Sequence, residues 1–129
     1  AIEFFHGYTY SAHPAACAAG LAALDIYQRE GLYDRAAEMM PYFAEAMMSL
    51  RDHPLVMDIR TIGMMSGVEV HHDGVPGRRG QAMQKALFWN GCHVKFTGDV
   101  AIVAPQFIAE RAHIDEVVDK LRRTFDEFV

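Results

Sequence analysis

The chain has 129 residues, 51% of them hydrophobic, and its 12 basic and 17 acidic residues give a formal net charge of −5. That length suffices for one domain with a hydrophobic core and is short for two ordinary domains. The acidic balance argues against a nucleic-acid partner or an anionic membrane surface, because both select basic faces. Two widely separated cysteines, Cys17 and Cys92, favour reduced thiols in a cytoplasmic protein. No apolar run approaches the roughly 20 residues that span a bilayer.

The first part of the chain predicts a loop followed by two helices. Residues 1–13 are aromatic and small without helical or strand periodicity, which indicates an extended loop. Pro14 suits a first helical position, and the small apolar run behind it predicts a helix that Gly31 ends. A helix that is apolar all round is expected to be buried. A second helix is expected over residues 32–51, with a kink or a restart at Pro41.

The remainder predicts four short strands, the last two of which form a hairpin, and two further helices. Short β-branched runs predict strands, a Gly-rich loop precedes a third helix, and a final apolar stripe predicts the last helix. The expected strands cover residues 56–61, 64–70, 92–96 and 100–104, and the third helix covers residues 78–90. This order predicts an α+β fold, a small and mostly antiparallel sheet covered by helices.

A few residues near the N-terminus are candidates for ligand binding or catalysis. No self-contained catalytic motif is present. Tyr8, Thr9 and Ser11 offer hydroxyls and amides just before a helix, where a phosphate can bind, although helix capping by Ser11 is the plainer interpretation. His6 and His13 flank this segment, and each is interpreted as a ligand, a base or a packed residue.

Lys95 is the most interesting charge, because it lies inside an apolar run near a Gly turn. It could bind a substrate carboxylate as a point charge, or it could be an edge-strand lysine that blocks pairing between sheets. Arg60 is interpreted as a partner in a salt bridge. Adjacent His71 and His72 would point to opposite faces of a strand, so no metal site is predicted.

Three segments resemble the class III (ω-type) aminotransferases, which are pyridoxal-phosphate enzymes of fold type I. Residues 5–19 read FHGYTYSAHPAACAA, and this wording is especially similar to the β-alanine:pyruvate or ω-amino acid:pyruvate branch. Residues 58–69 read DIRTIGMMSGVE, and residues 94–99 read VKFTGD. Both resemble family patterns and occur in the family's order.

The resemblance implies that the chain is the C-terminal portion of a longer enzyme. Residues 1–31 would belong to the end of the large, cofactor-binding domain, and residues 32–129 would form the small domain. The family's cofactor-bearing lysine, the acid beside the pyridine nitrogen and the ring-stacking aromatic would all come earlier. No catalytic residue is therefore expected here, and the isolated chain is expected to be inactive.

The resemblance also implies roles for three residues. Thr9, with the backbone N–H of Tyr8 beside it, would bind the cofactor phosphate of the partner subunit in a homodimer or a dimer of dimers. Lys95 stands where the family has a flexible arginine that binds the substrate carboxylate, so the charge is kept and the bidentate fork is lost. The parent would move an amino group from an amine or ω-amino acid to an α-keto acid such as pyruvate.

Two other interpretations of the chain stay open at this point. One is a non-catalytic α+β module that serves in assembly or ligand binding. The other is a small-molecule binder that uses the aromatic loop. Neither would need the cofactor-bearing lysine.

Overall fold

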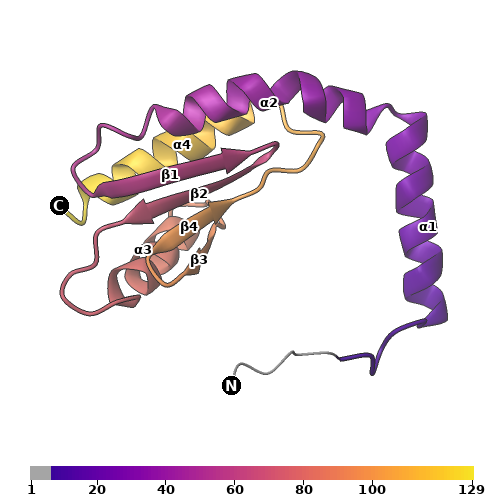
Figure 1. Cartoon of the computed structure of the whole chain (residues 1–129), viewed down its shortest axis with the longest axis horizontal. Coiled ribbons are helices and arrows are strands. Elements are labelled where there is room, and N and C mark those ends of the chain that lie inside the picture. Colours follow the sequence, from indigo (N-terminus) through magenta and orange to yellow (C-terminus); the bar gives the residue numbers. More distant parts are fainter. Residues whose placement is uncertain (1–6) are drawn as a thin grey trace. The chain divides into compact units, whose positions relative to one another are not determined.

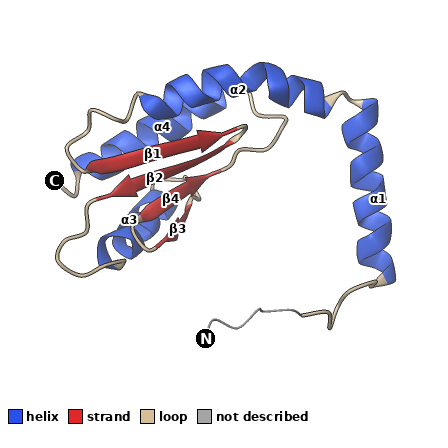
Figure 2. Ribbon diagram, viewed as in Figure 1, coloured by secondary structure: helices blue, strands red, loops and turns tan. Residues whose placement is uncertain are grey.

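The computed structural model describes residues 7–129, which divide into two compact units, one ending at Tyr33 and one running from Asp34 to Val129. The elements follow the predicted order (Figures 1 and 2). They are α1 (Pro14–Arg29), α2 (Leu32–Met48), β1 (Val56–Ile62), β2 (Met65–Val70), α3 (Arg78–Trp89), β3 (Lys95–Thr97), β4 (Val100–Val103) and α4 (Arg111–Asp126). The α+β fold class is confirmed.

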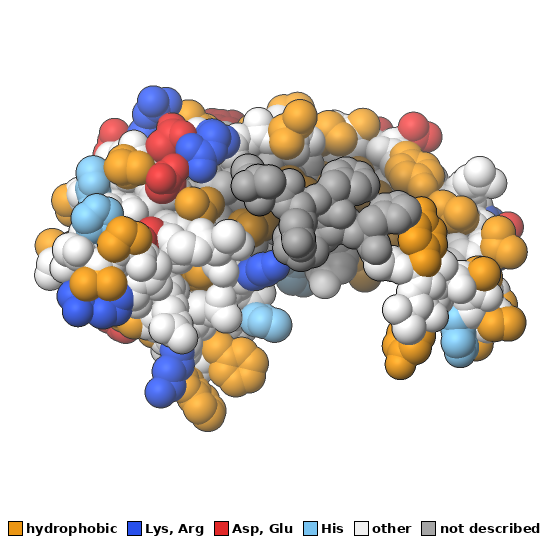
Figure 3. Space-filling model, turned by 60° about the horizontal axis from the view of Figure 1, so that its bottom comes forward, with side chains coloured by type: hydrophobic (Ala, Val, Ile, Leu, Met, Phe, Trp, Pro, Cys, Tyr) orange, Lys and Arg blue, Asp and Glu red, His pale blue; other side chains and the backbone are white. Residues whose placement is uncertain are grey.

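Helix α1 begins as the sequence predicts but is not buried. Pro14 occupies its first turn, and the Nδ1 atom of His13 accepts a hydrogen bond from the backbone N–H of Ala16 at 3.3 Å. None of its residues is buried, and Leu21 is 69% exposed. The hydrophobic side chains over α1 are visible at the right of Figure 3. The prediction of a buried helix is wrong for this chain, because its core is made by other segments.

Helix α2 passes through Pro41 as one element, so no restart occurs. Pro41 lies on an exposed position, where the lost backbone hydrogen bond does not leave a buried carbonyl without a partner. Beyond it, Phe43 and Met47 are almost completely buried in the core. Packing of these large side chains stabilises the second half of the helix against the proline.

The four described strands form one antiparallel sheet in the order β1-β2-β4-β3. Figure 2 shows α3 and α4 behind the sheet, and α2 joins them in the core. The most buried core residues come from all of these elements: Phe43, Met47, Val68, Met83, Leu87, Ala101, Leu121 and Phe125. Side chains that alternate with the buried positions of the strands therefore lie on the opposite, outer face of the sheet.

Among residues 7–129, no helix combines the length and the apolar composition that crossing a membrane requires.

Candidate functional site

The turn before α1 carries two of the predicted site residues, Tyr8 and Thr9. The backbone N–H of Ser11 donates to the carbonyl oxygen of Tyr8 at 3.0 Å, which closes the turn. Thr9 is exposed, and its hydroxyl forms no hydrogen bond with the described residues. Ser11 does not cap α1, because His13 takes that role.

The chemistry of this turn suits an anion. Residues 7–24 contain no acidic side chain, so nothing there repels a phosphate. A hydroxyl aimed at a dianion makes a short, charge-assisted hydrogen bond, and a helix N-terminus nearby favours negative charge. One hydroxyl and one backbone N–H would satisfy only part of a phosphate, and the remaining donors would have to come from other residues. His6 lies outside the described residues.

Lys95 lies on the outer face of the sheet. The strand register aligns Arg60, Gly67, Ile102 and Lys95 in one row across all four strands. The next row along the strands, which contains Phe96, is buried in the core. Arg60 and Lys95 therefore lie at opposite edges of one exposed face. Three strand spacings of about 4.8 Å separate them, which places their Cα atoms about 14 Å apart.

The two cations of this face differ in their surroundings. The Nη1 atom of Arg60 lies 2.7 Å from Asp58 Oδ2 and 2.9 Å from Glu69 Oε2. The hydrogen bond to Glu69 is the main reason that the pKa of Arg60 is raised. This salt bridge agrees with the interpretation of Arg60 from the sequence.

Lys95 is exposed, and its ammonium group has no hydrogen bond or ion pair within residues 7–129. It lies on β3, an edge strand of the sheet. The geometry thus suits both predicted roles, a point charge for a carboxylate and an edge residue that blocks sheet pairing.

A hollow of about 530 Å³ opens beside the start of β3. Val94, Val103 and Val117 give it an apolar lining, and Lys120 lies at its rim. Lys120 donates to the carbonyl oxygen of Gly91 at 3.2 Å and lies 2.7 Å from Glu116. That contact lowers the pKa of Glu116.

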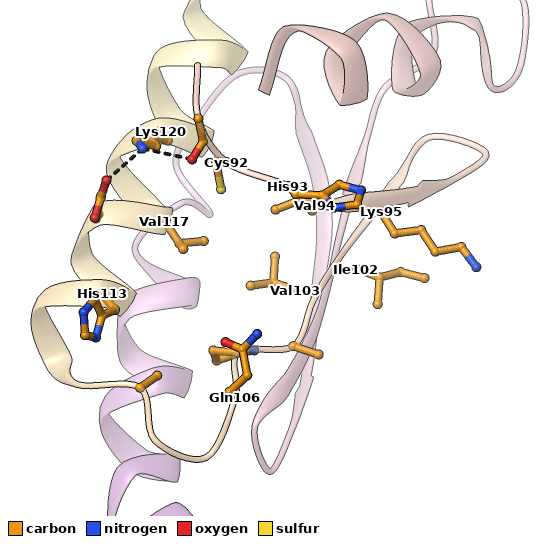
Figure 4. A pocket seen from close by; sticks show the side chains of 15 residues that line it. Cys92, His93, Val94, Lys95, Ile102, Val103, Gln106, His113, Val117 and Lys120 are labelled. Carbon is orange, nitrogen blue, oxygen red and sulfur yellow. Dashed lines mark hydrogen bonds and ion pairs between the residues drawn. The ribbon is translucent and has the colours of Figure 1, made fainter. Parts of the chain in front are cut away.

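Figure 4 shows Lys95 extending away from α4, the helix that carries His113 and Lys120. Lys95 is itself one of the residues that line the hollow, and its side chain points from there away from α4. Thr9 and Tyr8 lie in the first compact unit, and Lys95 lies in the second. Within residues 7–129, no group of three His, Cys, Asp or Glu residues is arranged to hold a metal ion.

Sequence analysis missed two polar side chains that hold the strand of Lys95. Gln84 on α3 accepts a hydrogen bond from the backbone N–H of Phe96 at 2.7 Å. Asp99 accepts hydrogen bonds from the N–H groups of Gly77 and Gly80, at 2.5 and 2.9 Å. The signal in the sequence is the Gly98–Asp99 pair, which predicts a turn but not the two hydrogen bonds that Asp99 accepts.

The comparisons with known proteins agree on one family. The family model for "Aminotransferase class-III" matches residues 2–125. An omega-aminotransferase from Caulobacter vibrioides is 42% identical over 127 residues, which are 98% of this chain and 29% of that protein. A beta-alanine–pyruvate aminotransferase from Pseudomonas aeruginosa is 42% identical over 120 residues, 92% of this chain and 27% of that protein.

Solved structures resemble the chain as well. A thermostable omega transaminase mutant from Pseudomonas jessenii superposes with a TM-score of 0.85 at 28% identity, over 98% of this chain and 30% of that one. The α+β arrangement is thus that of one part of a fold type I transferase. The chain belongs to the class III aminotransferase family. It spans about three tenths of the length of the curated relatives that it matches.

Proposed function

We propose that the protein containing these residues transfers an amino group from an amine or ω-amino acid to an α-keto acid such as pyruvate. The observation that carries the proposal is the family match over residues 2–125. The names of two relatives, a beta-alanine–pyruvate and an omega-amino acid–pyruvate aminotransferase, support this substrate class. Residues 1–31 would complete a large domain and residues 32–129 would form the small domain.

Pyridoxal 5′-phosphate is the proposed cofactor, and when bound it supplies the conjugated ring that accepts the electron pair released from the substrate amine. In this chain, the Thr9 hydroxyl and the Tyr8 backbone amide would hold its phosphate across a subunit interface. The exposed Thr9 hydroxyl and the lack of acidic side chains in residues 7–24 support that role. We also propose that the full-length protein is a homodimer or a dimer of dimers and that it lies in the cytoplasm. The two free thiols, Cys17 and Cys92, suit a reducing compartment.

Lys95 would bind and orient the carboxylate of the keto acid. Its ammonium group has no hydrogen bond or ion pair with the described residues 7–129, whereas Arg60 is already held by two carboxylates. A lysine attracts a carboxylate as a point charge, without the parallel pair of hydrogen bonds that an arginine makes. Recognition is therefore weaker and less directional than with arginine at the same position.

The test replaces Lys95 in the full-length protein. Lys95→Met should raise the KM for pyruvate about tenfold or more, because a hydrogen bond to a charged group contributes roughly 1.5–3 kcal/mol. Lys95→Arg should keep or lower that KM. The KM for an uncharged aldehyde should not change in either variant. Steady-state kinetics with both acceptors gives the answer.

Lys85→Met is the matched control, since Lys85 is an exposed lysine on α3. It should leave both KM values unchanged. An unchanged pyruvate KM in Lys95→Met would remove the carboxylate role. Absence of transamination in the full-length wild type would favour the non-catalytic module.

Residues 1–129 alone should not transaminate. Their lysines are Lys85, Lys95 and Lys120. Lys120 is bound to Glu116 and Gly91, and the other two are exposed. None lies where a buried, cofactor-bearing amine would be held. Turnover by this chain with added pyridoxal phosphate would contradict the expectation.

A further inference from the structure

Strand β3 is short and lies at the edge of the sheet. It consists of Lys95–Thr97 and pairs only with β4 among the described strands. Its other edge faces α3, where the Oε1 atom of Gln84 accepts the backbone N–H of Phe96 at 2.7 Å. Phe96 is only 9% exposed and this hydrogen bond is partly buried, so without Gln84 the N–H would lose its protein partner where access of water is restricted. Gln84 thus takes the place of a neighbouring strand.

The turn behind β3 is fixed to the same helix. The carboxylate of Asp99 accepts the N–H groups of Gly77 and Gly80 at the start of α3. Gly80 approaches the turn so closely that an added Cβ would lie 2.0 Å from the carbonyl oxygen of Gly98. Helix α3 therefore holds β3 at two points, its middle residue and its following turn.

Lys95 is the residue next to Phe96 on this strand. A three-residue edge strand paired on one side makes few hydrogen bonds of its own and opens readily. The helix contact at Phe96 fixes the backbone from which the Lys95 side chain extends. Without it, the ammonium group would be spread over a wider range of positions, and a point charge binds a small carboxylate well only where it is held.

We propose that Gln84 is a positioning residue for carboxylate recognition, acting through the Phe96 N–H on the placement of Lys95. The inference rests on the proposed function, in which Lys95 binds the acceptor carboxylate. Among residues 7–129 the Gln84 side chain hydrogen-bonds to Phe96 and not to Lys95, so its effect on carboxylate binding must appear as an effect on Lys95.

The experiment replaces Gln84 by methionine in the full-length protein loaded with its cofactor. Methionine has a similar shape and offers no strong acceptor to the Phe96 N–H. Gln81→Met is the matched control, because Gln81 is an exposed glutamine three residues earlier on the same helix. Gln84→Glu keeps an acceptor oxygen at the same place and serves as the rescue variant.

The expected result is selective. Gln84→Met should raise the pyruvate KM about three- to tenfold, the range that loss of one hydrogen bond corresponds to. The KM for propanal, which has no carboxylate, should stay within the error of the wild-type value. Gln84→Glu and Gln81→Met should behave as wild type. Hydrogen exchange of the peptide that contains Phe96 should accelerate only in Gln84→Met.

A double-mutant cycle shows whether Gln84 acts through Lys95. In a Lys95→Met background, Gln84→Met should have no further effect on the pyruvate KM. Equal increases of both KM values, additive effects in the cycle, or unchanged exchange at Phe96 would overturn the inference. If Lys95→Met discriminates between the acceptors while Gln84→Met does not, only this inference fails. If Lys95→Met itself does not discriminate, the carboxylate role and this inference fail together.

Discussion

At the scale of single residues, the surroundings of a charge decide whether it is available. Asp58 and Glu69 both contact Arg60, so an incoming anion would meet two carboxylates as well as the guanidinium. Exposed ion pairs of this kind contribute little to stability, about 0–1 kcal/mol. Their consequence here is selectivity, because in the row of residues shared by Arg60 and Lys95 they leave Lys95 without a carboxylate partner among residues 7–129.

Thr9 gives the first residue-scale prediction. Thr9→Ala in the full-length protein should weaken retention of pyridoxal phosphate about ten- to a hundredfold, because it removes a hydrogen bond to a dianion. Thr9→Ser keeps the hydroxyl and should retain the cofactor as the wild type does. Equilibrium dialysis followed by the absorbance of the bound cofactor measures both. Unaltered retention in Thr9→Ala would remove the phosphate role.

Cys92 gives a prediction about pH. Burial is the main cause that raises the pKa of its thiol above the ordinary value of 9.0, and nearby Lys120 opposes part of the effect. Because the pKa is raised in the folded state, the thiol ionises more easily in the unfolded chain. Its contribution to the free energy of unfolding is therefore fully present below pH 9 and is lost as the pH rises through the raised value. The folded chain should therefore lose stability above about pH 9.

The measurement is the urea midpoint of the chain between pH 7 and 10.5. Cys92→Ala should lower the midpoint at every pH, since it leaves a small cavity. It should also flatten the decline above pH 9. Cys17→Ala removes an exposed thiol and is the control. An identical slope in Cys92→Ala and wild type would contradict the assignment.

Single-residue roles were predicted unevenly, for a physical reason. The ion pairs of Arg60 join residues of one strand or of neighbouring strands, and short-range geometry suffices to expect them. The contacts of Gln84 and Asp99 join residues 12 to 22 positions apart. They depend on how α3 packs beside β3, which hydrophobic periodicity does not specify. The roles of Thr9 and Lys95 came from the resemblance and stay predictions.

At the scale of elements, periodicity and turn residues predicted the order of helices and strands. The strand that differs by more than one residue at an end is β3, expected over residues 92–96 and found at Lys95–Thr97. Continuing its register with β4 would bring Cys92 opposite Pro105, which has no N–H to donate. The burial of α1 was predicted wrongly, because composition says that a helix suits a buried place but not which surface covers it.

Two glycines in helices give an element-scale prediction. Gly80→Ala should destabilise the chain by about 2 kcal/mol or more, because the new Cβ would lie 2.0 Å from the carbonyl oxygen of Gly98. In α1, a Cβ added at Gly20 would have no neighbouring atom within 4 Å. Gly20→Ala should therefore raise the helix content, because alanine stabilises a helix interior by up to about 1 kcal/mol relative to glycine. Urea unfolding and far-ultraviolet circular dichroism measure the two effects. Equal stability of Gly80→Ala and wild type would contradict the close contact between α3 and the β3–β4 turn.

At the scale of the whole molecule, stability is concentrated in the second unit. The continuous core lies within residues 34–129, where helices cover one face of the sheet. Helix α1 contributes no buried side chain. Local unfolding of α1 therefore exposes almost no additional apolar surface, whereas opening the sheet would expose the core. The two units should thus differ sharply in how easily a protease reaches their backbones.

Limited proteolysis of the 129-residue chain tests that difference. Chymotrypsin should cleave first between residues 8 and 33, where the turn before α1, α1 itself and the start of α2 offer exposed tyrosine and leucine side chains, and leave a product that carries all four described strands. Cleavage within β1, β2, α3 or α4 requires loss of the shared core and should follow much later. In urea at a concentration that unfolds the chain, both regions should be cut at similar rates, which controls for sequence preference. Mass spectrometry of the early products identifies the first cut. Early cleavage inside the sheet, at the rate found for α1, would contradict a core confined to the second unit.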